Sequence, residues 1–239
     1  MAKLHDEWQV LPHGPLHEVA PGLLTVVGQI PMPLGNFPRR MSVIGLDSGR
    51  TAIFSPIPLR EEAMARIEAL GTPAYLIVPN GGHRLDLRPF HARYPKAKIV
   101  TAAGATSKVQ EAAKPVQTRA NLGKVAKIVT LAGCDEGEIA LIVRHADGDV
   151  SLLTNDVIGN VAHPKGIGAT IMSRMMGFGP TPRVTVAARK FFIKDKAALA
   201  AQFREWSEID GLRRLIPSHG DIIDRPAALL RRLADKLAA

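Results

Sequence analysis

The sequence has few of the residues that build disulfide-linked or nucleic-acid-stacking proteins. Its 239 residues include one cysteine, Cys134, so no intrachain disulfide can form and a reducing compartment is expected. Only 5% of the residues are aromatic, which provides no stacking platform for single-stranded nucleic acid. No apolar run is long enough to span a bilayer, and the charged start has no apolar core of a signal peptide. These absences predict a cytoplasmic protein without a membrane segment.

Positive charge is in excess, with 31 Lys and Arg against 22 Asp and Glu and a net charge of +9. Such an excess favours acidic partners in general. The basic residues are nevertheless scattered along the chain. We therefore interpret the excess as a solvated basic surface and expect a small-molecule substrate of unknown identity rather than nucleic acid. The oligomeric state stays open.

The hydrophobic pattern predicts strands and helices that alternate in the first half, and a group of strands that opens the second half. Strands are expected at residues 23–27, 41–46, 51–54, 75–78, 98–101, 125–131, 138–143, 150–153 and 212–216. Helices are expected at residues 59–70, 85–94, 196–209 and 225–237, with partial helix at 102–114 and no assignment for 160–183. The order fits two sheets covered by helices on the outside. We predict a single domain over residues 1–239, of which 1–40 form an N-terminal extension and the first strand.

Polar residues that could carry chemistry stand in three turns, each directly after an apolar strand. His83 ends the turn Asn80-Gly81-Gly82-His83, Asp156 follows Leu152-Leu153-Thr154-Asn155, and His219 lies in Pro217-Ser218-His219-Gly220. Ligands of layered α/β folds gather at such strand ends. Each residue also has an ordinary structural interpretation: a helix cap for His83, an N-cap for Asp156 and a surface loop for His219.

The order of these turns resembles the metallo-β-lactamase-fold hydrolases. That family carries H-x-H-x-D-H after an early strand, then a Gly-His turn, then L-L-x-x-D and a late P-x-H-G. His83, Asp156 and His219 match the last His of the first motif, the Asp and the late His, and Cys134 stands where the His of the turn would be. The resemblance implies an α/β fold, a metallo-β-lactamase-like four-layered αβ/βα sandwich. It also implies His83, Asp156, His219 and Cys134 as metal ligands, with the first three as catalytic residues.

The chain departs from the family pattern in the first motif. Val78 and Asn80 occupy the positions of the first two histidines, and Gly82 replaces the aspartate before His83. Residues 46–58 and 71–95 also resemble an uncharacterised branch of the superfamily, of the form S-P…L-G…Y-I-V-x-P-N-x-x-H…Y-P-x-A, which has no assigned activity. The resemblance therefore implies a degenerate site with fewer than two ions, either one zinc or iron ion or none.

Two functional hypotheses follow from this pattern. The first is a mononuclear metal-dependent hydrolase of unknown substrate, because two histidines, a carboxylate and water make a catalytic zinc sphere. Its general base would be Asp86 or Asp221, although Asp86 is expected to face solvent in the first turn of its helix. The alternative is a non-catalytic, metal-free binding or structural descendant of the fold. A nucleic-acid-processing protein ranks last.

The hypotheses share a geometric expectation. The side chains of His83, Asp156 and His219 should converge on one point, and Asn80 and Cys134 should line the same pocket. Cys134 should be buried and should not act as a redox switch, because a reactive thiol needs an exposed thiolate.

Overall fold

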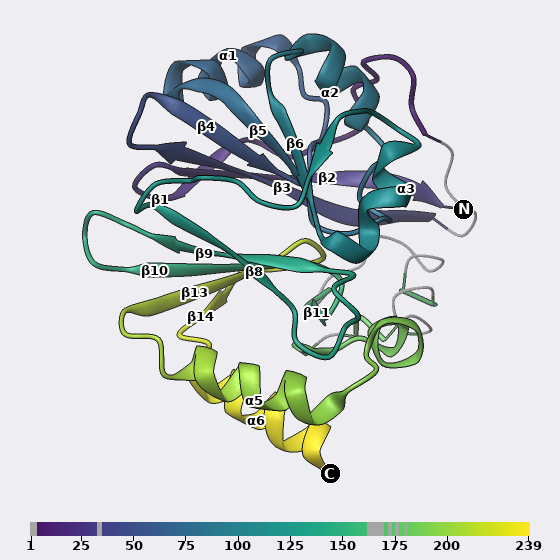
Figure 1. Ribbon diagram of the computed structural model, residues 1–239, viewed down its shortest axis with the longest axis vertical. Coiled ribbons are helices and arrows are strands. Elements are labelled where there is room, and N and C mark those ends of the chain that lie inside the picture. The colour runs from purple at the N-terminus through teal and green to yellow at the C-terminus, as the bar shows by residue number, and fades with distance from the viewer. Residues whose placement is uncertain (1–3, 33–34, 162–169, 172–173, 175–176, 180) are drawn as a thin grey trace.

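The chain folds into four layers, with a pair of sheets in the middle and helices outside. A computed structural model describes residues 4–32, 35–161, 170–171, 174, 177–179 and 181–239. Helices α1 and α2 cover one sheet, and α5 and α6 cover the other (Figure 1). The predicted αβ/βα sandwich is thereby confirmed.

The first sheet has seven strands in the order β1-β2-β3-β4-β5-β6-β7. Pairing is antiparallel from β1 to β4 and parallel from β4 to β7. The segment expected as an N-terminal extension thus contributes two strands and the beginning of a third. The strand bounds are β1 (His17–Ala20), β2 (Leu23–Met32), β3 (Gly35–Leu46), β4 (Arg50–Phe54), β5 (Thr72–Val78), β6 (Lys98–Thr101) and β7 (Val116–Gln117).

The second sheet has five strands in the order β14-β13-β10-β9-β8. Only β10 and β13 pair in parallel, and the remaining pairs are antiparallel. Its strands are β8 (Ala126–Thr130), β9 (Ile139–Arg144), β10 (Val150–Thr154), β13 (Leu212–Pro217) and β14 (Ile223–Asp224). The short strands β11 (Ile158–Gly159) and β12 (Arg183–Val184) pair with each other beside it.

The helices follow the predicted amphipathic segments closely. They are α1 (Glu61–Leu70), α2 (Leu87–Arg93), α3 (Thr106–Gln110), α5 (Lys196–Ser207) and α6 (Ala227–Ala238), with a 3₁₀ turn η1 (Ala103–Ala105) and a π-helical turn η2 (Ala188–Phe192). Part of residues 160–183, which the sequence left unassigned, lies outside the described residues. No helix in the described part of the chain has the length and apolar character needed to cross a membrane.

The core has two large apolar clusters, one on each side of the second sheet. Strand β9 shows why: Leu141 and Val143 join the cluster between the sheets, whereas Ala140 and Ile142 face the cluster beneath α5 and α6. Alternate side chains of a strand point to opposite faces, so a strand that is apolar at every position is covered on both sides. The continuous apolar strands in the sequence thus account for the layering.

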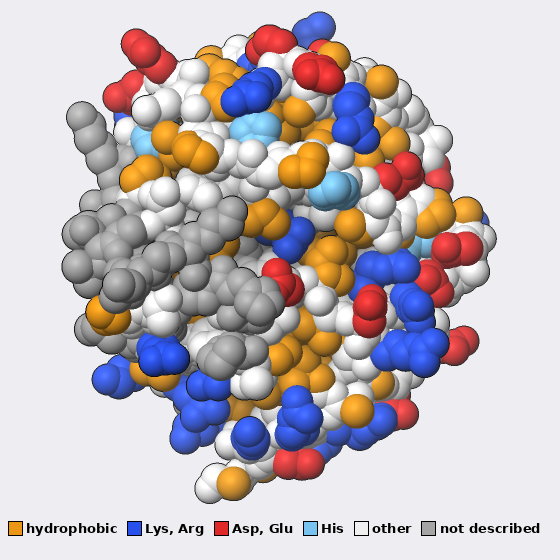
Figure 2. Space-filling view, turned by 180° about the vertical axis from the view of Figure 1, so that it is seen from behind, with side chains coloured by type: hydrophobic (Ala, Val, Ile, Leu, Met, Phe, Trp, Pro, Cys, Tyr) orange, Lys and Arg blue, Asp and Glu red, His pale blue; other side chains and the backbone are white. Residues whose placement is uncertain are grey.

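Basic side chains are distributed over the surface that Figure 2 shows. Lys and Arg lie among Asp and Glu there, and they are denser on the side of α5 and α6 than on the side of α1 and α2. On this face the positive charge is distributed over many side chains.

Candidate metal site

The turns singled out in the sequence meet at one edge of the sandwich because they follow parallel strands. Asp156 and His219 come after β10 and β13, which pair in parallel. His83 comes after β5, which runs parallel to β4. The Ile139 amide of β9 donates to the Pro79 carbonyl at 3.0 Å, which joins the end of β5 to the second sheet. The carboxyl ends of strands from both sheets therefore face one another.

Side chains of His83, Asp156 and His219 converge there, as predicted. The two Nε2 atoms of His83 and His219 are 3.2 Å apart, and Asp156 Oδ1 lies 3.3 Å from the first and 3.0 Å from the second. The side chains are only 8%, 18% and 5% exposed in the order of the sequence. Asp156 is thus the most accessible of the three side chains.

His219 is held in one tautomer by the backbone of β3. Its Nδ1 lies 2.6 Å from the carbonyl oxygen of Pro38. A carbonyl can only accept, so Nδ1 carries the hydrogen and a neutral imidazole keeps its lone pair on Nε2. The rings of Phe37 and Phe178 pack beside the imidazole at centroid distances of 4.9 and 5.2 Å. The lone pair therefore points at the other two groups from an apolar wall.

His83 is oriented by a serine at the end of β4. Ser55 Oγ lies 2.7 Å from His83 Nδ1, and a hydroxyl can accept the hydrogen of that nitrogen. Ser55 has a φ of 58°, a left-handed conformation that is uncommon for a residue with a side chain. Its backbone amide donates to the Ile77 carbonyl at 2.9 Å, which keeps the chain in this position. The strained residue therefore places its hydroxyl against the imidazole.

On its other side Asp156 is bound by the Asn80 amide, which also binds the buried acid Glu138. Asn80 Nδ2 donates to Asp156 Oδ2 at 2.7 Å and to Glu138 Oε2 at 3.1 Å. Glu138 is 2% exposed and also accepts from the Val157 amide at 3.2 Å and from Asn155 Nδ2 at 3.5 Å. One NH₂ group thus stands between two carboxylates.

Burial and charge shift the pKa values of these groups in different directions. Burial lowers the pKa of His83, which favours the neutral imidazole. Burial alone would raise the pKa of Asp156, but the two histidines outweigh it and hold that pKa well below its usual range. Burial and then the charge of Asp156 raise the pKa of Glu138 to about 8. Histidines that carry or share a proton therefore keep Asp156 ionised, while burial disfavours a full positive charge on His83.

This donor set fits a metal ion. Two nitrogen lone pairs and a carboxylate oxygen that face one another repel unless a proton or a cation lies among them. Ligand atoms at about 2.0–2.2 Å from a tetrahedral zinc ion are about 3.3 Å from each other, close to the separations of 3.0–3.3 Å here. His83, Asp156 and His219 could therefore hold one ion.

Cys134 is not part of this group of converging ligand atoms. It is 3% exposed, as predicted, and burial followed by the charges of Glu138 and Asp135 raises the pKa of its thiol to about 12. Together with Asn80 it lines a cavity whose lining does not include His83, Asp156 or His219, so the prediction that one pocket holds all five residues is wrong.

The two candidate general bases occupy different surroundings. Asp86 was expected to face solvent, and this is wrong: it is 1% exposed, because His5 Nδ1 lies 2.6 Å from its Oδ1 and Arg39 pairs with its other oxygen. A carboxylate held by two basic groups is poorly placed to take a proton from water. Asp221 is exposed, and its backbone is bound on both sides by Asn160.

Comparisons of the chain with known proteins agree with this architecture. No protein-family model and no curated protein sequence matches it. Among solved structures, the metallo-β-lactamase FIM-1 from Pseudomonas aeruginosa, in its mono-zinc form, aligns with a TM-score of 0.62 at 11% identity, over 95% of this chain and 96% of that one. A metallo-β-lactamase from Hirschia baltica gives 0.59 at 13% identity, over 95% and 98%. The chain has the metallo-β-lactamase fold.

A metal-soaked Flv1 flavodiiron core from Synechocystis shares the metallo-β-lactamase fold with this chain. Its TM-score is 0.61 at 14% identity, over 96% of this chain and 61% of that one. Identities this low establish the fold and leave reaction and substrate to the residues of the site.

Sequence reasoning missed several groups around the candidate metal ligands. The Pro38 carbonyl cannot be read from a motif, and Phe37 and Phe178 are ordinary apolar residues in the sequence. Ser55 and Glu138 left a weak signal, since Ser55 directly follows the apolar strand β4 and Glu138 directly precedes the apolar strand β9. Both lie at strand ends that the three chosen turns did not include.

Proposed function

We propose that the chain is a hydrolase that works with a single metal ion, zinc or iron, held by His83, Asp156 and His219. The observation that carries the proposal is the convergence of two Nε2 atoms and one carboxylate oxygen within 3.0–3.3 Å, with the His219 tautomer fixed by the Pro38 carbonyl. A bound ion would lower the pKa of its water toward about 7 and supply a nucleophile.

One ion rather than two is supported by what occupies the rest of the site. Asn80 directs its NH₂ group at Asp156 and Glu138, and a nitrogen that donates has no lone pair for a metal. Val78 is fully buried in β5, among core residues. The reduced motif that the sequence suggested therefore corresponds to a place filled by an amide and by core packing.

The surrounding residues would orient the ligands and exclude water. Ser55 and the Pro38 carbonyl hold the outer nitrogens of the two imidazoles, the role that hydrogen-bond partners of ligands play in metal sites. Phe37 and Phe178 cover the face of His219. Asp156 is the most accessible of the three ligands. An acyl or phosphoryl group of the substrate would therefore meet the attacking water beside Asp156, and the leaving group would depart with a proton.

Metal analysis of the purified protein tests this proposal. The protein is prepared without chelator, and its zinc and iron are measured per folded chain. We expect one equivalent, its loss in Asp156→Ala and His219→Ala, and its retention in the control His17→Ala, since His17 is exposed on β1. Restoring zinc to the stripped protein should raise its melting temperature, because a ligand at about 100 times its Kd adds about 2.7 kcal/mol to the free energy of unfolding.

The alternative, a metal-free descendant of the fold, predicts different results. The two site variants would then bind no less metal than the control, and zinc would leave the melting temperature unchanged. Two equivalents per chain would contradict a mononuclear site. Hydrolysis is then sought with a panel of ester, thioester, lactam and phosphodiester substrates, and activity that survives in Asp156→Ala would be assigned to a contaminant.

A further inference from the structure

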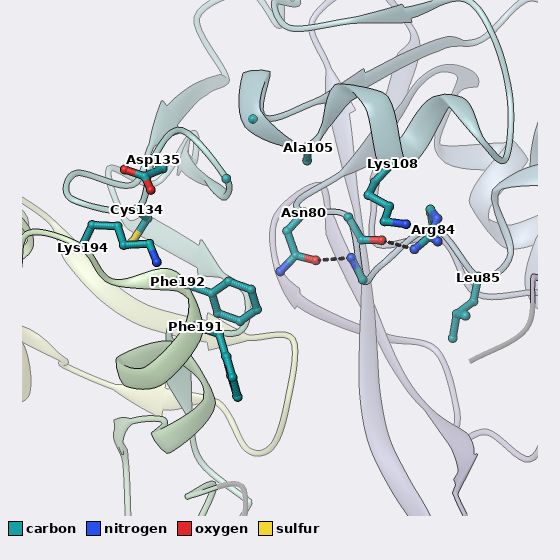
Figure 3. Close-up of a pocket in the computed structure, with 14 residues that line it drawn as sticks. Asn80, Arg84, Leu85, Ala105, Lys108, Cys134, Asp135, Phe191, Phe192 and Lys194 are labelled. Carbon is teal, nitrogen blue, oxygen red and sulfur yellow. Dashed lines mark hydrogen bonds between the residues drawn. The ribbon is translucent and has the colours of Figure 1, made fainter. Parts of the chain in front are cut away.

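A cavity of about 460 Å³ lies beside the metal-ligand group, on the far side of Asn80. Figure 3 shows Asn80, Arg84 and Lys108 along one wall, and Cys134, Phe192 and Lys194 along the other. Asn80 belongs to both places, because its Nδ2 lies 2.7 Å from Asp156 Oδ2. Cavities that bind small molecules commonly measure 300–1,000 Å³. A molecule in this one would reach the ligand group at the Asn80 end.

The wall that carries Lys194 is fixed by a glycine. Gly133 has a φ of +70°, and a Cβ there would stand 2.0 Å from the Asp195 carbonyl oxygen. Without that Cβ, the Gly133 carbonyl accepts from the amides of Lys194 at 2.7 Å and of Asp195 at 3.1 Å. The segment that follows η2 is thereby joined to the turn that bears Cys134, so this wall has a defined position.

Positive groups dominate the charges around the cavity. Its lining contains Arg84, Lys108 and Lys194 but only one carboxylate, Asp135. Arg84 and Lys108 both bind Glu111, each at 3.0 Å. Lys194 has no carboxylate within ion-pair distance among the residues that the structure describes. Lys194 is therefore the cation most available to an anionic ligand.

Two aromatic side chains beside Lys194 are left without cover. Phe191 is 69% exposed and Phe192 37%, and both line the cavity. Only five large apolar residues in the described part of the chain are exposed. Two of them are adjacent phenylalanines at one cavity, and such an exposed apolar surface is typical of a binding site. Leu85 and Ala105 extend the apolar lining on the opposite wall (Figure 3).

We propose that this cavity binds a small-molecule substrate that carries an anionic group and an aryl or alkyl portion. The anionic group lies at Lys194, the apolar portion packs on Phe191 and Phe192, and the bond to be hydrolysed is directed past Asn80 toward Asp156. This inference rests on the proposed function for the last point only, because the cavity and its charges are independent of any metal.

Binding of two matched probes tests the inference. The probes are 4-phenylbutyrate and its neutral amide, 4-phenylbutyramide, titrated into the whole protein and followed by NMR, once with zinc and once with chelator. We expect the carboxylate to bind about fivefold more tightly than the amide in both conditions, since a partly exposed ion pair contributes up to about 1 kcal/mol.

Substitutions of residues that line the cavity test whether the probes bind there. Lys194→Ala should remove the preference for the carboxylate and leave the affinity for the amide. Phe192→Ala should weaken both probes about tenfold. Lys190→Ala is the matched control, because Lys190 is exposed on the same η2 segment without lining the cavity, and it should change neither affinity.

The results separate this inference from the proposed function. Equal affinity for the two probes, no binding, or an equal loss in Lys190→Ala and Lys194→Ala would overturn it, even in a protein that holds one zinc ion. Conversely, a carboxylate preference that depends on Lys194 in a protein that takes up no metal would support the cavity and contradict the hydrolase.

Discussion

Replacing the buried Glu138 by glutamine should change how the stability of the protein depends on pH. Glu138 is 2% exposed and its pKa is raised to about 8, mainly by burial. Between pH 4.5 and 8 the folded state therefore holds a proton that the unfolded state has released. The unfolded state binds fewer protons there, so the free energy of unfolding falls as pH rises and levels off above pH 8.

The size of this effect follows from the shift. Raising the pKa from 4.5 to about 8 corresponds to about 5 kcal/mol at 1.36 kcal/mol per pH unit, an upper limit. In Glu138→Gln the proton is absent at every pH. Where the new NH₂ group replaces Oε2 it no longer accepts from Asn80 Nδ2, but it can donate to Asn155 Oδ1, which has no partner among the described residues, once the Asn155 amide turns. As pH rises from 4.5 to 8, we expect the free energy of unfolding of the variant to increase by about 3–5 kcal/mol relative to that of the unchanged protein.

Urea unfolding at half-unit intervals from pH 4.5 to 8.5, in chelator, measures this difference. Burial lowers the pKa of His83, whose contribution to stability therefore rises with pH and partly hides the trend in either protein alone. Subtracting the two curves removes it. Glu136→Gln, a change at an exposed position two residues away, is the control and should follow the unchanged protein. Parallel curves for Glu138→Gln and the unchanged protein would refute the reasoning.

Three further predictions concern residues next to the site. Cys134, with a thiol pKa of about 12, should react with a thiol reagent at pH 8 only after unfolding; fast native labelling would contradict its burial. Ser55→Ala should lower zinc affinity 10–100-fold in a competition titration, since it removes the hydrogen bond to an imidazole; unchanged affinity would exclude this role. Gly220→Ala should destabilise the protein and weaken zinc binding, because its Cβ would stand 1.9 Å from the Asn160 carbonyl oxygen. The control Gly148→Ala, also at positive φ but in open space, should affect only stability. Equal zinc affinities of the two variants would contradict this prediction.

The layered fold was readable from the sequence because several central strands contain continuous apolar runs. Such runs predict strands covered on both faces, and the run at residues 75–78 corresponds to β5. The short strands β1, β7, β11, β12 and β14 were missed. Four of them have only two residues and leave no measurable alternation, and β1 has only two apolar residues, so their pairing is decided by the neighbouring strand.

The convergence of His83, Asp156 and His219 was partly predictable for a similar reason. His83, Asp156 and His219 each follow an apolar strand, and parallel pairing brings such positions together. Their orientation was not predictable, because it depends on a carbonyl at Pro38 and on the left-handed backbone of Ser55. Backbone acceptors exist at every residue, so only the register of the sheets decides which one meets a histidine.

Asn80 explains how the site can hold two neighbouring acids. Asp156 and Glu138 both accept hydrogen bonds from the Asn80 NH₂ group, which stands where a histidine ligand was expected. Two ionised carboxylates in a buried place repel, and burial, followed by the charge of Asp156, raises the pKa of Glu138 to about 8. Two features reduce the repulsion between the acids: the Asn80 NH₂ group donates to both of them, and Glu138 keeps a proton near neutral pH. Asp156 is then left ionised, with its free oxygen directed at the two imidazoles, as a single metal ion requires.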